Sequence, residues 1–224
     1  MHVEIIIMTK YPTPGGVKTR LIGSLSPESA ADLYERCIRL TFNVAAPLMG
    51  DQTRVVVAGA PDDADFSRLL PPGFECRPQG EGDLGARIGR AMNRAFAGGA
   101  SRAIVIGCDC PDLQTSTLQD ALGALEAPDA AVIGPAADGG YYLLGIRRPV
   151  PGLFEGIDWS TERVCSQTVE RFHDGGCHVH TLPRLSDLDE PEDLVRFADS
   201  APTGRLADEL RAHVRTLIGR GSRP

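Results

Sequence analysis

The sequence predicts an α/β fold: a single domain with a mainly parallel, mixed sheet and helices on both faces. Short apolar, β-branched runs alternate with longer helical patterns along most of the 224 residues, as they do in strand–helix–strand units. Most of these runs are apolar throughout, which is typical of parallel strands buried on both faces. Successive parallel strands are then expected to be joined by right-handed crossovers.

The opening strand is predicted at residues 3–8, which are apolar except for Glu4. Ser26, Pro27 and Glu28 supply an N-cap, a first-turn proline and a first-turn acid, and they predict a helix over residues 27–48. The other elements predicted up to the middle of the chain are strands at 53–58 and 74–77 and helices at 62–70 and 83–97.

The second half of the chain continues the alternation. Predicted here are strands at 103–106, 130–134, 141–146 and 177–182 and helices at 115–126 and 161–174. The tail has an apolar helical stripe formed by Leu206, Leu210, Val214, Leu217 and Ile218. This stripe is expected to pack on the domain or on a second subunit of a homodimer. We therefore expect a domain of residues 1–200 followed by a C-terminal helix and tail at 201–224, frayed from residue 219.

Composition and charge exclude several classes of protein. The net charge of −7 argues against general nucleic-acid binding, and no apolar run approaches the roughly 20 residues of a membrane span. The first eight residues lack a basic region and a cleavage site, so no signal peptide is expected and the predicted location is cytoplasmic. The six cysteines lack Cys-x-x-Cys spacing and are expected to be free thiols.

Ligands of open α/β sheets bind beyond the carboxyl ends of the strands. The first such loop, residues 9–21, is rich in cations and glycines: Lys10, Lys18, Arg20, Gly15 and Gly16. Three cations beside glycines that expose backbone N–H groups suit a di- or triphosphate. The spacing does not fit a Walker A loop, and the alternative is a solvated turn with surface cations.

The loop at residues 79–87 has a Gly-x-Gly-x-x-Gly pattern at Gly80, Gly82 and Gly85. A dinucleotide-dependent oxidoreductase is therefore a rival interpretation. Asp83 opposes it, because a carboxylate at a helix N-terminus repels a pyrophosphate while it caps the helix well. We expect Asp83 to be that cap and the loop to border a nucleotide base.

Three aspartates follow predicted strands. Asp109 comes after the strand at 103–106, and Mg²⁺ or Mn²⁺ would explain it, because these ions favour one or two carboxylates with waters and substrate phosphates. Asp187 and Asp189 project to one side of an extended segment and form a second half-site. The alternatives are an Asx-turn at Asp109 and a helix cap at Asp189 or Glu190.

A hairpin signal, Asp138-Gly139-Gly140, joins the strands at 130–134 and 141–146. Tyr141 follows at once, and an aromatic ring beside glycines also leaves room for a sugar or another flat polar ligand. His178 and His180 share one face of a strand, but no further His or Cys stands at ligand spacing, so zinc is a minor alternative.

The sequence resembles a bacterial GT-A-type transferase family whose members are often described as arsenosugar-biosynthesis or nucleotide-diphospho-sugar glycosyltransferases. The resemblance covers about residues 3–199 and rests on an ordered series of stretches: KYPTPGGVKTRL, GDLGAR, GCDCPDL, GPAADGGYYLLG, IDWST and DLDEPEDL. The first loop and the acidic stretches are more distantly similar to 2-phospho-lactate and molybdenum-cofactor guanylyltransferases and to CMP-sugar synthetases.

The resemblance implies a GT-A-like fold and a metal-dependent transferase that acts on a nucleotide or nucleotide-sugar donor and a small-molecule acceptor. Residues implied to grip phosphates are Lys10, Lys18 and Arg20. Residues implied to hold Mg²⁺ or Mn²⁺ are Asp109, Asp187 and Asp189. Residues implied to line the nucleotide pocket are Gly82, Asp83 and Gly85. Residues implied to face the transferred group are Asp138, Gly139, Gly140 and Tyr141.

The reaction type stays open. Glycosyltransferases of this fold usually carry Asp-x-Asp, whereas Asp109-Cys110-Pro111 has a single acid, as nucleotidyltransferases do. Glycosyl transfer is the first expectation, with Lys18, Arg20 and Asp109 in catalytic roles. Nucleotidyl transfer with release of pyrophosphate is the alternative, and a nucleotide-binding protein without turnover is a third.

Overall fold

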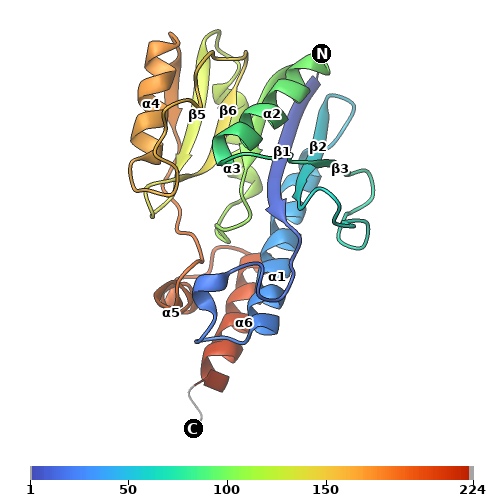
Figure 1. Ribbon diagram of the computed structural model, residues 1–224, viewed down its shortest axis with the longest axis vertical. Helices are drawn as coiled ribbons and strands as arrows, with labels where there is room; N and C mark the ends of the chain where they lie inside the picture. The colour runs from blue at the N-terminus through green and yellow to red at the C-terminus, as the bar shows by residue number, and fades with distance from the viewer. Residues whose placement is uncertain (1, 222–224) are drawn as a thin grey trace.

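A mixed sheet forms the centre of the molecule (Figure 1). The computed structural model describes residues 2–221, and within them the sheet has the strand order β3-β2-β1-β4-β6-β5-β7. The strands are β1 (His2–Lys10), β2 (Thr53–Ala60), β3 (Glu75–Pro78), β4 (Ala100–Ile106), β5 (Ala130–Pro135), β6 (Tyr141–Ile146) and β7 (His178–Thr181). β6 runs antiparallel to β4 and β5, and the other neighbouring pairs are parallel. The predicted mainly parallel, mixed sheet is confirmed.

Helices cover both faces of this sheet, as predicted. They are α1 (Pro27–Ala45), α2 (Leu84–Ala97), α3 (Thr115–Ala124), α4 (Val164–Asp174), α5 (Pro191–Asp199) and α6 (Arg205–Gly221). The hydrophobic core consists of two clusters, one on each face of the sheet. Residues of β1 contribute to both, because successive side chains of a strand point to opposite faces. Ile5 and Ile7 join a cluster with residues of α1, α3, α5 and α6. Ile6 joins a second cluster with residues of α2 and α4.

Local sequence signals begin the helices where they were expected. The Ser26 hydroxyl accepts the backbone N–H of Ser29 at 3.1 Å at the start of α1. Asp83 accepts the N–H of Ala86 at 2.8 Å at the start of α2. Both side chains satisfy a donor that the first helical turn leaves free, so the prediction of Asp83 as a cap is confirmed.

The prediction of a helix at residues 62–70 is wrong. This segment is a series of turns, in which the Asp65 carboxylate accepts the backbone N–H of Ser67 at 2.9 Å. Such a local side-chain acceptor competes with helical hydrogen bonds. The helix predicted to reach residue 48 ends at Ala45 and tightens into a 3-10 turn over Ala46–Leu48, because Pro47 has no N–H to continue it.

The C-terminal helix α6 lies beside α5 and α1 (Figure 1). Leu210, Val214 and Leu217 are buried in the first core cluster, so the apolar stripe packs on the protein's own domain. Residues 219–221, which were expected to be frayed, continue α6, and residues 222–224 lie outside the described residues. Among the helices of residues 2–221, none combines the length and apolar character needed to cross a bilayer.

We expect Phe172→Ala to lower the free energy of unfolding by about 3–5 kcal/mol, because it removes a fully buried ring and leaves a cavity between α4 and the sheet. Urea denaturation followed by circular dichroism measures the loss. Val195→Ala, at a position on α5 that is 51% exposed, is the control and should change stability by less than about 0.5 kcal/mol. Equal losses in the two variants would contradict the assigned packing of α4.

Candidate active site

The loops after β1, β4, β5 and β7 open at the same edge of the sheet, because these four strands run in one direction. β1 and β4 are neighbours although β2 and β3 come between them in the chain. The crevice beyond them is therefore a topological switch point, where α/β sheets bind ligands.

Backbone hydrogen bonds join the acidic loops at this edge. The N–H of Leu188 donates to the carbonyl of Asp109 at 2.9 Å, and the N–H of Leu185 donates to the carbonyl of Pro135 at 3.1 Å. The loop after β7 is thus attached to the loop after β4 and to the end of β5. These contacts bring the segment of Asp187 and Asp189 beside Asp109.

A buried ammonium group lies at the centre of the site. Lys18 Nζ donates to Asp109 Oδ1 in a short ion pair and to Asp189 Oδ1 at 2.8 Å. The Lys18 side chain is 2% exposed, whereas the carboxylates of Asp109 and Asp189 are 46% and 37% exposed. One cation therefore joins two acids whose other surfaces are open to a ligand.

Lys18 stays charged in this setting. Burial alone would lower its pKa, but attraction from Asp109 and then Asp189 outweighs burial and holds the pKa well above its ordinary value. The ammonium also lies 5.6 Å from the ring centroid of Tyr34, within the range of a cation–π contact. The backbone of Lys18 is left-handed, with φ of 47°, a conformation that surrounding contacts must hold in a residue other than glycine.

Helix α1 supports the first loop from below. The Tyr34 hydroxyl lies 3.1 Å from Thr9 Oγ1 and accepts the backbone N–H of Lys10 at 3.2 Å. Cys37, one helical turn further on, is fully buried near Lys18, and burial raises the pKa of its thiol to about 12. The role of Tyr34 was not predicted from the sequence. A buried tyrosine needs a hydrogen-bond partner, but nothing local indicates that the partner is Thr9.

The backbone of Asp189 is held by the start of α5. Asp193 Oδ2 accepts the N–H groups of Asp189 at 3.0 Å and of Glu190 at 2.7 Å. Glu190 is the N-cap and forms a capping box with Asp193. Of the two residues expected as alternatives for a helix cap, Glu190 is therefore the cap, and the carboxylate of Asp189 is available to Lys18.

Negative charge accumulates around this single ammonium. Burial raises the pKa of Asp187 to about 6, and repulsion by Asp138 and Asp189 adds to the shift. The carboxylates of the hairpin turn and of the loop after β7 therefore lie close enough to interact. Within residues 2–221, no three His, Cys, Asp or Glu side chains are grouped closely enough to hold a metal ion by themselves.

The two cysteines beside Asp109 turn into the protein. Cys108 and Cys110 are 2% and 5% exposed. Burial and the charge of Asp109 raise both thiol pKa values, that of Cys108 to about 12. Buried, protonated thiols are poor metal ligands, so of these three neighbouring side chains Asp109 is the one that could contact a cation. All six cysteines are free, as predicted.

A segment around Trp159 connects two glycine-rich stretches. A Cβ on Gly85 would lie 2.5 Å from the Trp159 ring. A Cβ on Gly139 would overlap the backbone of Glu162. Gly139 also has φ of +91°, which glycine adopts more readily than other residues, so both sterics and backbone conformation require glycine here. Gly82, with Asp83, precedes α2 on the same side. The predicted nucleotide loop and the hairpin turn thus share one supporting segment.

The two tyrosines of β6 lie on opposite faces of the sheet. Tyr141 packs on the cluster of α2 and α4, where burial raises its hydroxyl pKa. Tyr142 packs in the other cluster, and its hydroxyl donates to the carbonyl of Pro183 at 2.9 Å. Tyr142 therefore supports the loop that carries Asp187 and Asp189. The hairpin itself is as predicted, with Asp138 accepting the N–H of Gly140 at 2.8 Å.

The remaining predicted residues of the first loop lie at the protein surface. Lys10, Gly15, Gly16 and Arg20 are exposed. Arg20 Nη1 lies 3.6 Å from Glu190 Oε1, in a pair that both partners expose to solvent, so it contributes little stability. Hollows of about 310 and 640 Å³ lie elsewhere and are not lined by Lys18, Asp109 or Asp189. We place the site at the charged crevice because its chemistry is concentrated there.

Comparison with known families agrees with this geometry. Residues 41–161 match the model of a family described as uncharacterized protein conserved in bacteria (DUF2064). No curated protein matches the chain. The chain is similar to the crystal structure of a candidate nucleotide-diphospho-sugar transferase from Desulfovibrio desulfuricans G20, with 33% identity, a TM-score of 0.87 and coverage of 99% of each chain.

Two more distant structures share the fold. One is 2-C-methyl-D-erythritol 4-phosphate cytidylyltransferase from Thermus thermophilus, with 15% identity, a TM-score of 0.54 and coverage of 96% of this chain and 100% of that one. The other is glucosyl-3-phosphoglycerate synthase from Mycobacterium tuberculosis in complex with Mn²⁺, uridine-diphosphate and glucosyl-3-phosphoglycerate. It has 10% identity, a TM-score of 0.52 and coverage of 97% and 80%. The predicted GT-A-like fold and family resemblance are confirmed.

We expect Asp187→Asn to stabilise the metal-free protein above about pH 6 and to have little effect near pH 4. The folded pKa of Asp187 is about 6, against an ordinary value of 3.8. Between these values the folded state binds more protons than the unfolded state, so the stability of the unaltered protein falls as pH rises. The variant lacks this loss. Melting temperatures measured from pH 4 to 8 in a chelator test the prediction.

Asp63→Asn, at an exposed acid, is the matched control, and its difference from the unaltered protein should not vary over this range. If the difference in melting temperature between Asp187→Asn and the unaltered protein were constant with pH, the pKa of Asp187 would not be raised in the folded state.

Proposed function

We propose that this chain, which belongs to the DUF2064 family of uncharacterized bacterial proteins, is a metal-dependent transferase that uses a nucleotide donor. The observation that carries the proposal is the buried Lys18 ammonium held between Asp109 and Asp189 at the switch point of the sheet. A structural core seldom needs a buried lysine shared by two exposed acids. A site that must bind phosphates and a cation together does.

The donor set fits Mg²⁺ or Mn²⁺. Asp109, Asp187 and Asp189 offer carboxylate oxygens, which these hard ions prefer, and Asp109 and Asp189 are substantially exposed. Such ions are commonly held by one or two carboxylates with donor phosphates and waters, so a complete protein cage is not required. Burial and then repulsion by Asp138 raise the pKa of Asp187, and a divalent cation would relieve both by stabilising the ionised carboxylate. When bound, the ion would neutralise charge on the phosphates of the donor.

The protein's own cations would act on the same phosphates. Lys18 would direct its permanently charged ammonium at the leaving phosphate from a water-poor position, where a fixed charge is most effective. Lys10 and Arg20, which are exposed at the protein surface, would attract and orient the donor. Gly15 would offer its backbone N–H group between these cations, whereas the N–H of Gly16 donates to the carbonyl of Thr13 at 2.9 Å and shapes the turn.

The glycine-rich walls would receive the rest of the donor and the acceptor. Gly82, Asp83 and Gly85 would border the base, with the Asp83 carboxylate kept in place by the Ala86 N–H. Asp138, Gly139, Gly140 and Tyr141 would form the wall beside the transferred group. In this arrangement Tyr141 would act through packing beneath the hairpin, since its hydroxyl is buried.

Glycosyl transfer is the reaction we favour. The similar Desulfovibrio structure, which spans nearly the whole chain at 33% identity, is described as a candidate nucleotide-diphospho-sugar transferase. In this reaction the acceptor attacks the anomeric carbon of the sugar and a nucleoside diphosphate leaves. The alternative, nucleotidyl transfer, is favoured by the absence of an Asp-x-Asp pair in the loop after β4, because Asp109 is followed by the buried Cys110 and by Pro111. There the acceptor attacks the α-phosphorus and pyrophosphate leaves.

Asp109→Ala is expected to abolish Mn²⁺-dependent nucleotide binding, because it removes both a cation ligand and the partner of Lys18. Isothermal titration with nucleoside diphosphates and nucleotide sugars, with and without Mn²⁺, measures the effect. Asp120→Ala, at an exposed position on α3, is the control and should bind as the unaltered protein does. Unchanged Mn²⁺-dependent affinity in Asp109→Ala would refute the role of this carboxylate.

Incubation with labelled donors and a panel of sugar, lipid-phosphate and small hydroxylated acceptors distinguishes the two reactions. Glycosyl transfer releases a nucleoside diphosphate from a nucleotide sugar, whereas nucleotidyl transfer releases pyrophosphate from a nucleoside triphosphate. We expect the first product, with Mn²⁺ or Mg²⁺ required. Metal-dependent nucleotide binding without either product across the panel would favour a binding protein.

A further inference from the structure

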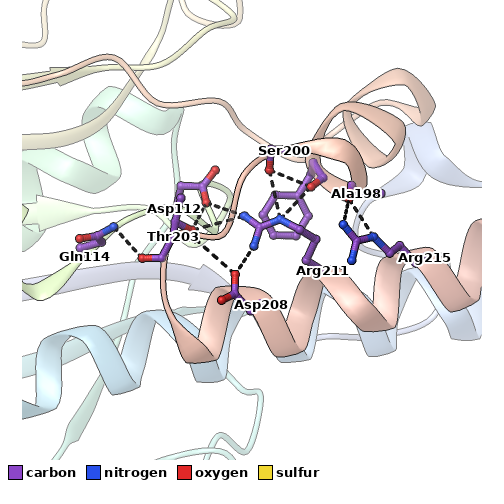
Figure 2. Close-up of polar contacts among 9 residues, drawn as sticks. Asp112, Gln114, Ala198, Ser200, Thr203, Asp208, Arg211 and Arg215 are labelled. Carbon is purple, nitrogen blue, oxygen red and sulfur yellow. Dashed lines mark hydrogen bonds and ion pairs between the residues drawn. The ribbon is translucent and has the colours of Figure 1, made fainter.

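A second buried cation, Arg211 of α6, lies outside the proposed chemistry (Figure 2). Its side chain is 3% exposed, and its guanidinium lies 4.6 Å from the ring centroid of Phe197. Arg211 Nε donates to the carbonyl of Phe197 at 3.0 Å and to Ser200 Oγ at 3.1 Å. These contacts fix the guanidinium against the end of α5.

The same guanidinium reaches the loop that carries Asp109. Arg211 Nη2 donates to Asp112 Oδ1 at 3.2 Å, and Nη1 forms a short ion pair with Asp208. Thr203 Oγ1 donates to the same oxygen of Asp112 at 2.6 Å. Two carboxylates thus neutralise a charge that would be costly to bury alone. One of them lies three residues after Asp109 in the loop between β4 and α3.

The loop is held at its proposed metal ligand, Asp109, and again after it. Gln114 Nε2 donates to the carbonyl of Thr203 at 3.0 Å, which ties the end of the loop to the segment before α6 (Figure 2). Asp109 itself contacts Lys18 through its carboxylate and Leu188 through its carbonyl. Arg211 thus holds, through Asp112, the part of the loop that follows Asp109.

We propose that Arg211 is a positioning residue, which acts through Asp112 to fix the loop at residues 107–113 so that Asp109 meets Lys18 and Asp189. The inference rests on the proposed function, since it assigns Arg211 to the same cation and phosphate site. A ligating carboxylate must be held within about 0.5 Å of its productive position. A buried, multiply bonded guanidinium provides such a fixed support, because little freedom is left to its planar fork.

Arg215 supplies a matched control on the same helix. Its guanidinium donates to the carbonyl of Ala198 at 2.9 Å and 2.5 Å. This contact ties α6 to α5, as Arg211 does through Phe197, but it involves no residue of the loop at 107–113. Substitution of either arginine is therefore expected to weaken the packing of α6 on α5. Only substitution of Arg211 is expected to change the position of the loop at 107–113.

Hydrogen exchange of the metal-free protein tests the mechanical part of the inference without any assumption about function. We expect Arg211→Met and Asp112→Asn to speed amide exchange about tenfold in peptides covering 107–113 and 185–190, the effect of losing one charge-assisted hydrogen bond. Arg215→Met should leave these peptides unchanged. Unchanged exchange at 107–113 in both Arg211→Met and Asp112→Asn would overturn the inference.

Mn²⁺ titration in the presence of a nucleotide, followed by the electron paramagnetic resonance signal of free Mn²⁺, tests the connection to the site. We expect Arg211→Met to raise the half-saturating Mn²⁺ concentration about tenfold, the usual range for a residue that orients a metal ligand. Arg211→Lys should recover part of this loss. The double variant with Asp112→Asn should be no worse than Arg211→Met, because both changes remove one contact.

A structural role alone would lower the melting temperature of both arginine variants and leave the Mn²⁺ dependence of Arg211→Met unchanged, which would overturn the positioning role. Failure of the unaltered protein to bind Mn²⁺ would instead refute the proposed function, while the exchange measurement would still decide whether Arg211 holds the loop. Asp112→Asn preserves the size of its side chain, so it provides the test if Arg211→Met does not fold.

Discussion

The burial of the Lys18 ammonium is the constraint on which the geometry of the site depends. Removing a charged amine from water costs several kcal/mol unless opposite charges and hydrogen bonds compensate. Here the compensation comes from Asp109 and Asp189, which belong to loops after different strands. The ion pair is therefore satisfied only when three distant segments are folded together. The left-handed backbone at Lys18 and the Tyr34 contacts below it hold the amine at that junction.

One ammonium does not balance the acids around it. Asp138 and Asp187 add negative charge beside Asp189, and this repulsion adds to the effect of burial in raising the pKa of Asp187. A protein selected for stability alone would be expected to lose such a carboxyl, since its ionised form destabilises the folded state at neutral pH. Retaining it is understandable if the surplus charge is used for binding, because functional sites commonly trade stability for activity. The electrostatic imbalance is thus a positive argument for a cationic ligand.

The sequence was sufficient to predict which loops meet, because β-branched runs identify parallel strands and parallel strands share an edge. It also predicted the caps Ser26 and Asp83, whose signals lie within four residues. It could not predict the support from Tyr34 or the pairing of Asp112 with Arg211, which joins residues 99 positions apart. The turns at 62–70 were missed for a local reason, since the acceptor role of Asp65 competes with the helical pattern. Which face of the sheet Tyr141 and Tyr142 each occupy could not be predicted either, because it depends on the register of β6 with its neighbouring strands.

The site cannot be separated from the C-terminal helix. Leu210, Val214 and Leu217 complete the core beneath α1, the same helix that places Tyr34 under Lys18. Arg211 then connects that packing to the loop of Asp109 on the other side of the crevice. The two members of the central ion pair, Lys18 and Asp109, are thus supported by one packed layer of α1 and α6. Because a rigid layer transmits small displacements rather than absorbing them, changes in the packing of α6 should reach both partners of the ion pair together.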